Sequence, residues 1–559
     1  MKRTNHRDQR KVRRTAKGHV HDPRSLQEVQ ECLGAMTRRR DLLIEYLHRI
    51  QDRFGSLAAR HLVALARELR LSVAEIYEVT SFYHHFDIVS EGAGAPPMLT
   101  VRVCDSISCS LAEAEELVAA LQASLVGRIR VQRVPCVGRC HSAPVAVVGC
   151  NPVERATPQR VMAAIAAGAT APSLPAYPVY DNYRRTGGYT TYRRCLAGEL
   201  SAEQVIAELE ASPLRGLGGA GFPVGRKWRI VRGQAAPRRM AVNIDEGEPG
   251  TFKDGHYLAN DPHRFLEGML IAAAVVGIES ITIYLRDEYA ACRALLEKEL
   301  EALVADPPGP LPRIELRRGA GAYICGEESA MLESIEGRRG QPRLRPPYVA
   351  EVGLLGRPTL VHNLESLYWV RDLLEKGADW FNAQGRRGCK GLRSFSVSGR
   401  VNRPGVHLAP AGITLRELLV EHCGGMLPGH ELYGYLPGGA SGGILPAALA
   451  DLPLDFDILN AYGCFIGSAA VIVFSRQDRA RNIALNAMRF FEKESCGQCT
   501  PCREGTVRAR ELMEQGRWDV GLLQDLANVM SDASICGLGQ AAANPLRCVL
   551  RYFPEELHS

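Results

Sequence analysis

The spacing of four cysteines near the end of the chain constrains this protein more than any other feature. Three of them lie three residues apart in SCGQCTPC, and the fourth follows in SICGLG: Cys496, Cys499, Cys502 and Cys536. Three thiolates at this spacing can hold three corners of a cubic cluster, which the distant fourth completes. Four cysteines also suit tetrahedral zinc, but zinc usually takes two C-x2-C pairs. The run therefore favours a 4Fe–4S cluster over a structural zinc site.

A second cysteine group lies in the first third of the chain. Its members are found in CDSISC and CVGRC: Cys104, Cys109, Cys136 and Cys140. Each pair follows an expected strand, at residues 99–103 and 129–134, so the two loops can face each other. Two facing pairs of thiolates suit a 2Fe–2S cluster, with zinc as the alternative that spacing alone leaves open.

The other nine of the seventeen cysteines are scattered, and we expect them to be small buried hydrophobes rather than disulfides. They are Cys32, Cys150, Cys195, Cys292, Cys325, Cys389, Cys423, Cys464 and Cys548. No signal peptide is recognisable, and the longest apolar stretch, 268–278, is about half of a membrane span. We therefore expect a cytoplasmic protein without a membrane span.

The net charge of +6 is concentrated at the start of the chain. Residues 1–20 hold eight Lys or Arg against one Asp, a local +7, so the remainder sums to about −1. The body thus offers no basic field for nucleic acid. We expect residues 1–25 to form a basic disordered tail, with contact to RNA, membrane or an acidic partner as the alternative and a transit peptide as a third reading.

The pattern of apolar residues divides the rest of the chain. Helical spacing at 40–54 and 58–70 predicts a helical region over 26–95, and residues 92–97 resemble a linker. Strands and a helix at 111–125 then predict a small α/β domain over 96–175, followed by an Ala/Pro-rich connector at 163–178. An α/β domain is expected over 176–385, a β-rich domain over 386–475 and a helical domain over 476–559.

Three segments in the α/β domain carry the residues of a candidate cofactor site. RGLGGAGFPVGRKW, at 215–228, exposes backbone N–H groups beside positive charge, which suits a flavin phosphate or a pyrophosphate as well as a structural turn. NIDEGEPGTFKD, at 243–254, carries three carboxylates in a turn, which can accept hydrogen bonds from sugar hydroxyls, bind a metal or face solvent. In GAYICGEES, Glu327 and Glu328 come where a helix begins, a favourable place for carboxylates.

These elements together resemble the flavoprotein core of respiratory complex I and its relatives. RGLGGAGFP, the NxDExEPG-type loop, GAYICGEES and SCGQCTPCREGT occur in that family's order, over about 180–559. Residues 26–175 resemble the family's separate thioredoxin-like 2Fe–2S subunit, so two subunits look fused here. The resemblance implies a helical bundle, a thioredoxin-like domain, a Rossmann-like FMN domain, a β-grasp-like domain and a C-terminal helical bundle with the 4Fe–4S cluster.

The resemblance also implies roles for single residues. FMN and NAD(H) would contact Gly216, Gly218, Gly219, Phe222, Lys227, Asn243, Asp245, Glu246, Glu248, Tyr323, Gly326, Glu327, Glu328, His362 and Asn363. Lys227 would lie near the FMN and Glu248 beside the nicotinamide, and these two are the candidate catalytic residues. His362 departs from the family's Asn-Asn pair, as Val224 departs from a frequent Thr.

The fused arrangement is most similar to the β subunit of NAD-dependent formate dehydrogenases. That resemblance implies a catalytic α subunit with a molybdenum or tungsten pterin centre as partner, and electron flow through iron–sulfur clusters and FMN to NAD⁺. The alternatives are the same module of a NAD-reducing hydrogenase or of complex I. A zinc-stabilised scaffold that binds RNA through the tail is an alternative of another class.

Overall fold

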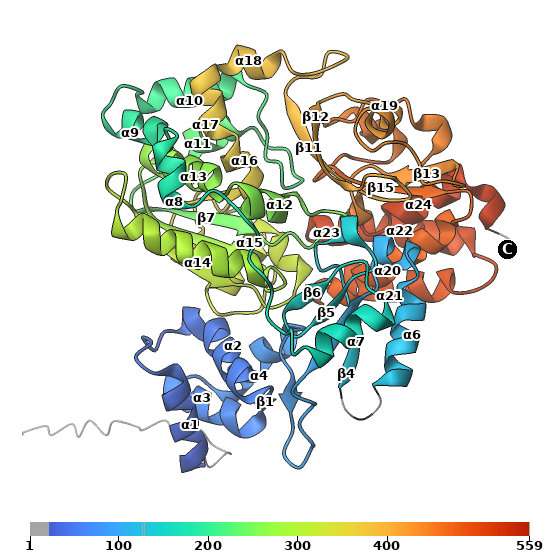
Figure 1. Cartoon of the computed structure of the whole chain (residues 1–559), viewed down its shortest axis with the longest axis horizontal. Coiled ribbons are helices and arrows are strands. Elements are labelled where there is room, and N and C mark those ends of the chain that lie inside the picture. Colours follow the sequence, from blue (N-terminus) through green and yellow to red (C-terminus); the bar gives the residue numbers. More distant parts are fainter. Residues whose placement is uncertain (1–21, 126, 128, 558–559) are drawn as a thin grey trace, which may run out of the picture. The chain divides into compact units, whose positions relative to one another are not determined.

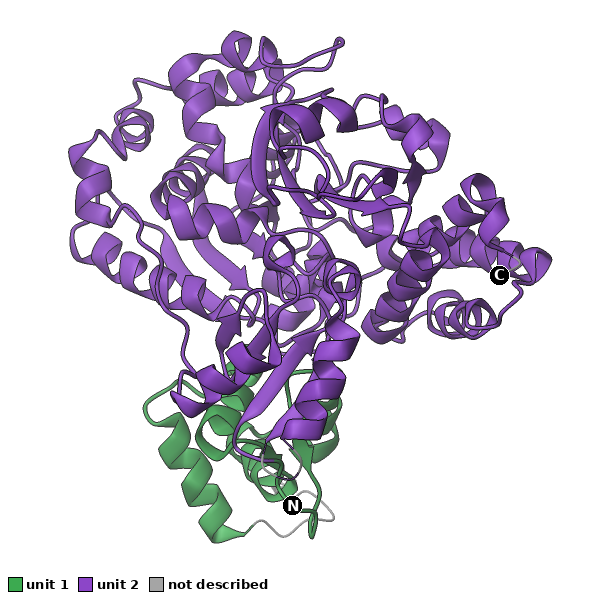
Figure 2. Ribbon diagram, turned by 45° about the vertical axis from the view of Figure 1, so that its right-hand side comes forward, with its two compact units in different colours: residues 1–96 green, residues 97–559 purple. Residues whose placement is uncertain are grey.

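The computed structural model describes residues 22–557 except 126 and 128. The chain divides into two compact units, Met1–Pro96 and Pro97–Ser559, which Figure 2 colours separately. Among the described residues, no helix is long and apolar enough to cross a membrane.

The described part of the first unit is helical, as its apolar spacing predicts. Its elements are α1 (Pro23–Leu33), α2 (Leu43–Phe54), α3 (Ala59–Leu69), α4 (Val73–Phe82) and the short strands β1 (Leu57–Ala58) and β2 (Ile88–Val89). Helix α1 already begins inside the stretch predicted as a tail, because Asp22 accepts from the backbone N–H groups of Arg24 and Ser25 and Pro23 occupies the first turn. The rest of that predicted tail lies outside the described residues.

The second unit opens with a small α/β fold. Its sheet has the order β4-β3-β5-β6, in which β3 and β4 are parallel. The elements are β3 (Thr100–Cys104), α5 (Ile107–Leu111), α6 (Ala114–Ser124), β4 (Arg130–Val134), β5 (Ala146–Val148), β6 (Asn151–Val153) and α7 (Pro158–Ala166). The helix predicted over 111–125 is α6, which begins only at Ala114 because Glu113, its N-cap residue, has a positive φ of 62°. Helix α7 also occupies the start of the predicted connector.

A four-stranded parallel sheet with the order β10-β7-β8-β9 forms the centre of the next region (Figure 1). Its strands are β7 (Arg238–Ile244), β8 (Ile278–Leu285), β9 (Arg313–Arg318) and β10 (Thr359–Asn363). The helices are α8 (Tyr180–Arg185), α9 (Thr190–Leu196), α10 (Ala202–Ala211), α11 (Val224–Arg232), α12 (Lys253–Asn260), α13 (Pro262–Val276), α14 (Ala290–Ala305), α15 (Glu328–Ile335), α16 (Leu364–Tyr368), α17 (Val370–Lys376) and α18 (Ala378–Asn382).

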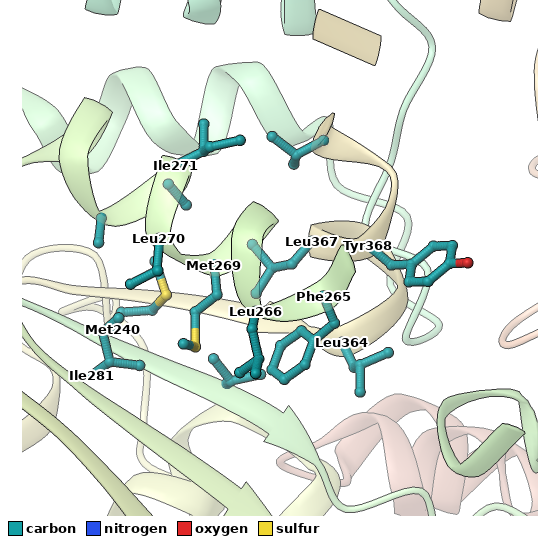
Figure 3. Close-up of a cluster of buried hydrophobic side chains, with 14 of the residues drawn as sticks. Met240, Phe265, Leu266, Met269, Leu270, Ile271, Ile281, Leu364, Leu367 and Tyr368 are labelled. Carbon is teal, nitrogen blue, oxygen red and sulfur yellow. The ribbon is translucent and has the colours of Figure 1, made fainter. Parts of the chain in front are cut away.

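Helix α13 anchors the core of this region. Figure 3 shows its side chains, among them Leu266 and Met269, together with Met240 of β7 and Ile281 of β8, and all four are buried. Burying each such side chain stabilises the fold by about 1.5–3 kcal/mol. A Cβ at Gly268 would lie 1.9 Å from the carbonyl oxygen of Leu367, so only glycine lets α13 approach α16 this closely.

The β-rich region and the helical end follow as predicted. A mixed sheet with the order β12-β11-β15-β13-β14 contains β11 (Leu392–Gly399), β12 (Gly405–Pro410), β13 (Leu432–Leu436), β14 (Leu445–Pro446) and β15 (Ala470–Ser475), with helix α19 (Leu415–Glu421). The final helices are α20 (Ala480–Glu494), α21 (Thr500–Met513), α22 (Val520–Ala533), α23 (Gly537–Ala541) and α24 (Asn544–Tyr552).

The scattered cysteines are less uniformly buried than expected. Five are buried, namely Cys292, Cys325, Cys423, Cys464 and Cys548. Cys32, Cys195 and Cys389 are partly exposed, and Cys150 is exposed at the turn between β5 and β6. A turn residue has no neighbouring layer to cover it, so the expectation of burial was wrong for Cys150.

Candidate functional site

The glycine-rich loop closes on itself just before α11. Gly216 donates to the carbonyl of Phe222 (2.8 Å), and Leu217 donates to the hydroxyl of Ser366 (2.9 Å). A Cβ at Gly218 would lie 3.0 Å from the Cβ of Asn363, whereas a Cβ at Gly219 would meet nothing within 4 Å. Gly219 has a φ of 131°, which favours glycine. The loop thus turns its backbone toward open space beside the end of β10.

Two nitrogen-bearing side chains of the predicted site lie behind this loop. Lys227 Nζ donates to the carbonyl of Val361 (3.1 Å), and burial lowers the pKa of Lys227. Buried Trp228 donates from Nε1 to His362 Nε2 (2.7 Å), which leaves Nδ1 as the protonated nitrogen of a neutral imidazole. Burial and the neighbouring Lys227 lower the pKa of His362, and its buried Nδ1 has no hydrogen-bond partner among the described atoms.

Phe222 is an exposed aromatic residue of the predicted set. The residue is 36% exposed, and the guanidinium of Arg226 and the ammonium of Lys227 lie 5.6 Å and 5.9 Å from its ring centroid. An aromatic face next to two cations is suited to stacking against an anionic nucleotide.

The acidic loop leaves the carboxyl end of β7, next to β10. Asn243 and Asn363 are register partners on these parallel strands, and Asn243 Nδ2 donates to the carbonyl of Gly326 (2.8 Å). Asp245 Oδ2 is buried without a hydrogen-bond partner among the described atoms, and burial raises the pKa of Asp245. An unpaired buried acceptor at this position calls for a donor from a bound molecule.

Glu246, in contrast, already has its partners within the chain. Its carboxylate accepts from the backbone N–H groups of Asp254 (2.9 Å) and Gly255 (3.1 Å) at the start of α12, and from the hydroxyl of Tyr289 (2.7 Å). Burial and the charge of Asp254 raise the pKa of Glu246 to about 7. Glu246 therefore braces the acidic loop against α12 and Tyr289, and its contact with the cofactor stays a prediction.

Glu327 and Asn363 likewise cap helices. Glu327 accepts from the backbone N–H groups of Ser329 (2.9 Å) and Ala330 (2.8 Å) at the start of α15, and Asn363 accepts from that of Glu365 (3.0 Å) at the start of α16. Glu328 is partly exposed and pairs with Arg345 (3.0 Å).

A buried ion cluster that the sequence did not reveal supports Asn363. Lys253 Nζ lies 2.8 Å from Asp254 and 3.0 Å from Glu365, all three side chains being 2% exposed. It also donates to Asn363 (3.3 Å), which itself donates to Asp254 (2.5 Å). Burial opposes the charge, but the two carboxylates raise the pKa of Lys253 overall. Lys253 and Asp254 are the last two residues of the acidic motif, and that position was the sequence signal from which the ion cluster could have been suspected.

Glu248 and Tyr323 connect the acidic loop to the C-terminal helices. The Tyr323 hydroxyl donates to Glu248 Oε2, and Ser441 donates to Oε1 from its backbone N–H (2.7 Å) and hydroxyl (2.8 Å). Burial raises the pKa of Glu248. The backbone N–H of Tyr323 donates to Glu494 (2.8 Å), the last residue of α20 and two positions before Cys496.

The four N-terminal-group cysteines converge. Cys104 ends β3 and Cys136 follows β4, and all four side chains are at most 5% exposed. The sulfurs of Cys136 and Cys140 lie 3.3 Å apart, and the Cys104 thiol interacts with those of Cys109 and Cys136. Phe252 packs against Cys136 and Cys140, so the group adjoins the acidic loop.

The C-terminal-group cysteines gather at two helix starts. Cys499 precedes α21, Cys502 lies in its first turn, and Cys536 precedes α23. Cys502 interacts electrostatically with Cys496, Cys499 and Cys536. Burial raises the pKa of the Cys536 thiol to about 11, and the backbone N–H groups of Gly539 and Leu538, which reach its sulfur, offset part of that rise.

The donor sets fit the expected cofactors. Two separate groups of four thiols suit two iron–sulfur clusters. The open space at Gly219, the unpaired Asp245 oxygen and the unpaired His362 nitrogen suit a ligand with a phosphate and several hydroxyls, as FMN has.

Family models match along most of the chain. Residues 209–372 match a Nuo51 FMN-binding domain, 482–559 the iron–sulfur binding region of NADH-ubiquinone oxidoreductase F, 29–169 a thioredoxin-like 2Fe–2S ferredoxin and 394–445 an SLBB domain. These matches confirm the predicted fold class and the predicted FMN, 4Fe–4S and 2Fe–2S cofactors.

Individual relatives agree with these domains. The structure of a NAD⁺-reducing NiFe hydrogenase in the H2-reduced state is 32% identical, with a TM-score of 0.81 and 93% of both chains covered. The NADH-quinone oxidoreductase F subunit of Streptomyces coelicolor is 42% identical over 67% of this chain and 86% of its own length. The F 2 subunit of the Rhizobium meliloti enzyme is 39% identical over 68% of this chain and 94% of its own length. The chain belongs to the family of NADH-quinone oxidoreductase F subunits, with a thioredoxin-like 2Fe–2S domain fused ahead of the family's own domains.

Proposed function

We propose that this chain exchanges electrons between NAD(H) and the iron–sulfur clusters of partner subunits. The observation that carries the proposal is the unbroken contact from Glu248 through Tyr323 to Glu494 and the Cys496 loop. It joins the wall proposed for the nicotinamide to the loop proposed for the 4Fe–4S cluster. FMN, when bound, supplies the step between two-electron hydride chemistry and one-electron transfer.

The chain's own residues would position the two rings. The flavin would approach the backbone closely at Gly216, Gly218 and Gly219, which have no side chains. The ammonium of Lys227 would attract the negative charge of the flavin at this place. Asn243 and Asp245 would accept or donate at the ribityl chain, where Asp245 Oδ2 is unpaired. The ring of Phe222 would stack against the adenine, and Glu248 would orient the nicotinamide. Because orientation and exclusion of water are the protein's tasks in such a reaction, no acid–base residue is required.

We assign the two cysteine quartets as cluster ligands. Cys496, Cys499, Cys502 and Cys536 would hold the 4Fe–4S cluster on the route to a partner. Cys104, Cys109, Cys136 and Cys140 would hold the 2Fe–2S cluster as an additional electron site. Single Cys→Ala variants, followed by EPR, test each set separately.

We further propose that the partner is the molybdenum- or tungsten-containing catalytic subunit of a formate dehydrogenase. The loops EGEPGTFKD and RGAGAYICGEES and the complete 104–140 cysteine quartet support this choice. The second candidate is a NAD-reducing hydrogenase, which the likeness of 93% of the chain to such an enzyme favours.

A single assay distinguishes the formate dehydrogenase partner from the hydrogenase partner. The chain is purified with its natural partners and supplied anaerobically with formate or with H2, while NAD⁺ reduction is followed at 340 nm. Formate-dependent reduction supports the first partner, and H2-dependent reduction replaces it with the second. NADH oxidation with ferricyanide, measured in the same preparation, tests the electron-exchange proposal independently of the partner.

A further inference from the structure

Arg286 joins the 2Fe–2S loop to the acidic loop from inside the protein. It follows β8, and its side chain is 4% exposed. Its Nη2 donates to the backbone carbonyl of Cys136 (2.6 Å), and its Nη1 donates to that of Glu246. One guanidinium thus contacts a proposed cluster ligand and the loop proposed to face the flavin.

The surrounding residues hold this guanidinium in place. Glu288 accepts from Nη2 (2.7 Å) and Nε (3.1 Å), and the Tyr289 ring lies 5.3 Å from the guanidinium carbon. Tyr289 in turn donates to Glu246, and a Cβ at Gly138 would meet the Tyr289 hydroxyl at 2.4 Å. The cluster loop therefore fits closely against Tyr289, whose ring lies beside Arg286, and the guanidinium of Arg286 is a planar fork that remains charged.

The charge has a defined consequence for redox chemistry. Reduction of an iron–sulfur cluster adds one negative charge, and a nearby buried cation stabilises that charge more strongly than a solvated one does. The hydrogen bond from Arg286 reaches the backbone carbonyl of Cys136 rather than its sulfur, so the charge of the guanidinium is the source of the effect. The carboxylate of Glu288 partly neutralises the guanidinium of Arg286 and so reduces this stabilisation of the reduced cluster.

We propose that Arg286 fixes the Cys136 loop against the FMN domain and raises the reduction potential of the 2Fe–2S cluster. Arg286 is thus a positioning residue. The inference depends on the ligand set proposed above, since Cys136 must belong to the cluster.

The test is a potentiometric titration of the full chain, followed by EPR of the reduced 2Fe–2S cluster. Arg286→Gln should lower the reduced-to-oxidised ratio at a fixed potential about tenfold, a shift of about 59 mV for one electron. Arg286→Lys keeps the charge and should recover part of the shift. Glu288→Gln removes the neutralising carboxylate and should move the potential upward.

Arg318→Gln is the matched control. Arg318 ends the neighbouring strand β9 and pairs with Asp287, so its loss should leave the potential unchanged. The inference is overturned if the reduction potential of the 2Fe–2S cluster stays constant in Arg286→Gln. If Arg286→Gln fails to fold, an unchanged potential in both Arg286→Lys and Glu288→Gln overturns it instead. A wild-type chain without a 2Fe–2S signal contradicts the ligand assignment instead.

Discussion

The buried Lys253 cluster gives a quantitative prediction about the flavin region. Lys253→Met would remove the ammonium that lies between the carboxylates of Asp254 and Glu365, in a cluster whose three side chains are 2% exposed. Removing one partner of a buried ion pair costs about 3–5 kcal/mol, because the remaining charge is uncompensated. For a domain of about 150–250 residues, that corresponds to a Tm decrease of roughly 6–20 °C.

Hydrogen exchange read by mass spectrometry is the suitable assay, because it reports local opening in a multidomain chain. Peptides that cover β7, α12 and β10 should lose protection by about 3–5 kcal/mol.

Two further variants make the prediction sharp. The triple variant Lys253→Met, Asp254→Asn and Glu365→Gln should recover much of the protection, since no charge of the cluster is left. Lys376→Met is the matched control: Lys376 is 47% exposed and 3.8 Å from Asp372, so the change should be at most about 0.5 kcal/mol. A loss below about 1 kcal/mol in Lys253→Met would refute the account of this cluster.

Three other outcomes are expected. Gly218→Ala should reduce the FMN content of the purified chain, because the new Cβ would lie 3.0 Å from Asn363, whereas Gly233→Ala, whose Cβ would lie 3.5 Å from its nearest neighbours, should retain it. Glu248→Gln should raise the KM for NADH about tenfold, equivalent to about 1.4 kcal/mol, through weaker bonds to Tyr323 and Ser441; an unchanged KM in steady-state NADH–ferricyanide kinetics would count against its role. Cys499→Ala should abolish the 4Fe–4S EPR signal while NADH still bleaches the flavin, and survival of that signal would exclude Cys499 as a ligand.

The sequence predicted the elements whose signal is local. Apolar spacing located α2 and α3, because a helix with one buried face repeats its apolar residues every three or four positions, and β3 and β4 lie where strands were expected. The cysteine spacing was equally informative, since cluster ligation requires thiolates at short intervals. The late start of α6, after Glu113, escaped prediction because a positive φ at that residue depends on packing rather than on residue type.

The site was predictable only to the level of motifs. Glu246, Glu327 and Asn363 lie where the motifs put them, but their side-chain oxygens accept from backbone N–H groups at helix starts. The motif alone could not separate a cap from a ligand contact, because both use the same carboxylate or amide. Arg286 and Ser441 had no local signal, since their partners are more than 100 positions away in the sequence at Cys136 and Glu248.

The most direct test of the central claim is an anaerobic spectrum of the purified chain, with iron and flavin quantified before and after NADH is added. The account predicts about six irons and one FMN per chain, flavin bleaching by NADH, and EPR signals of a 4Fe–4S and a 2Fe–2S cluster after reduction. A folded chain, kept free of oxygen, that contained zinc in place of iron and no flavin would contradict it.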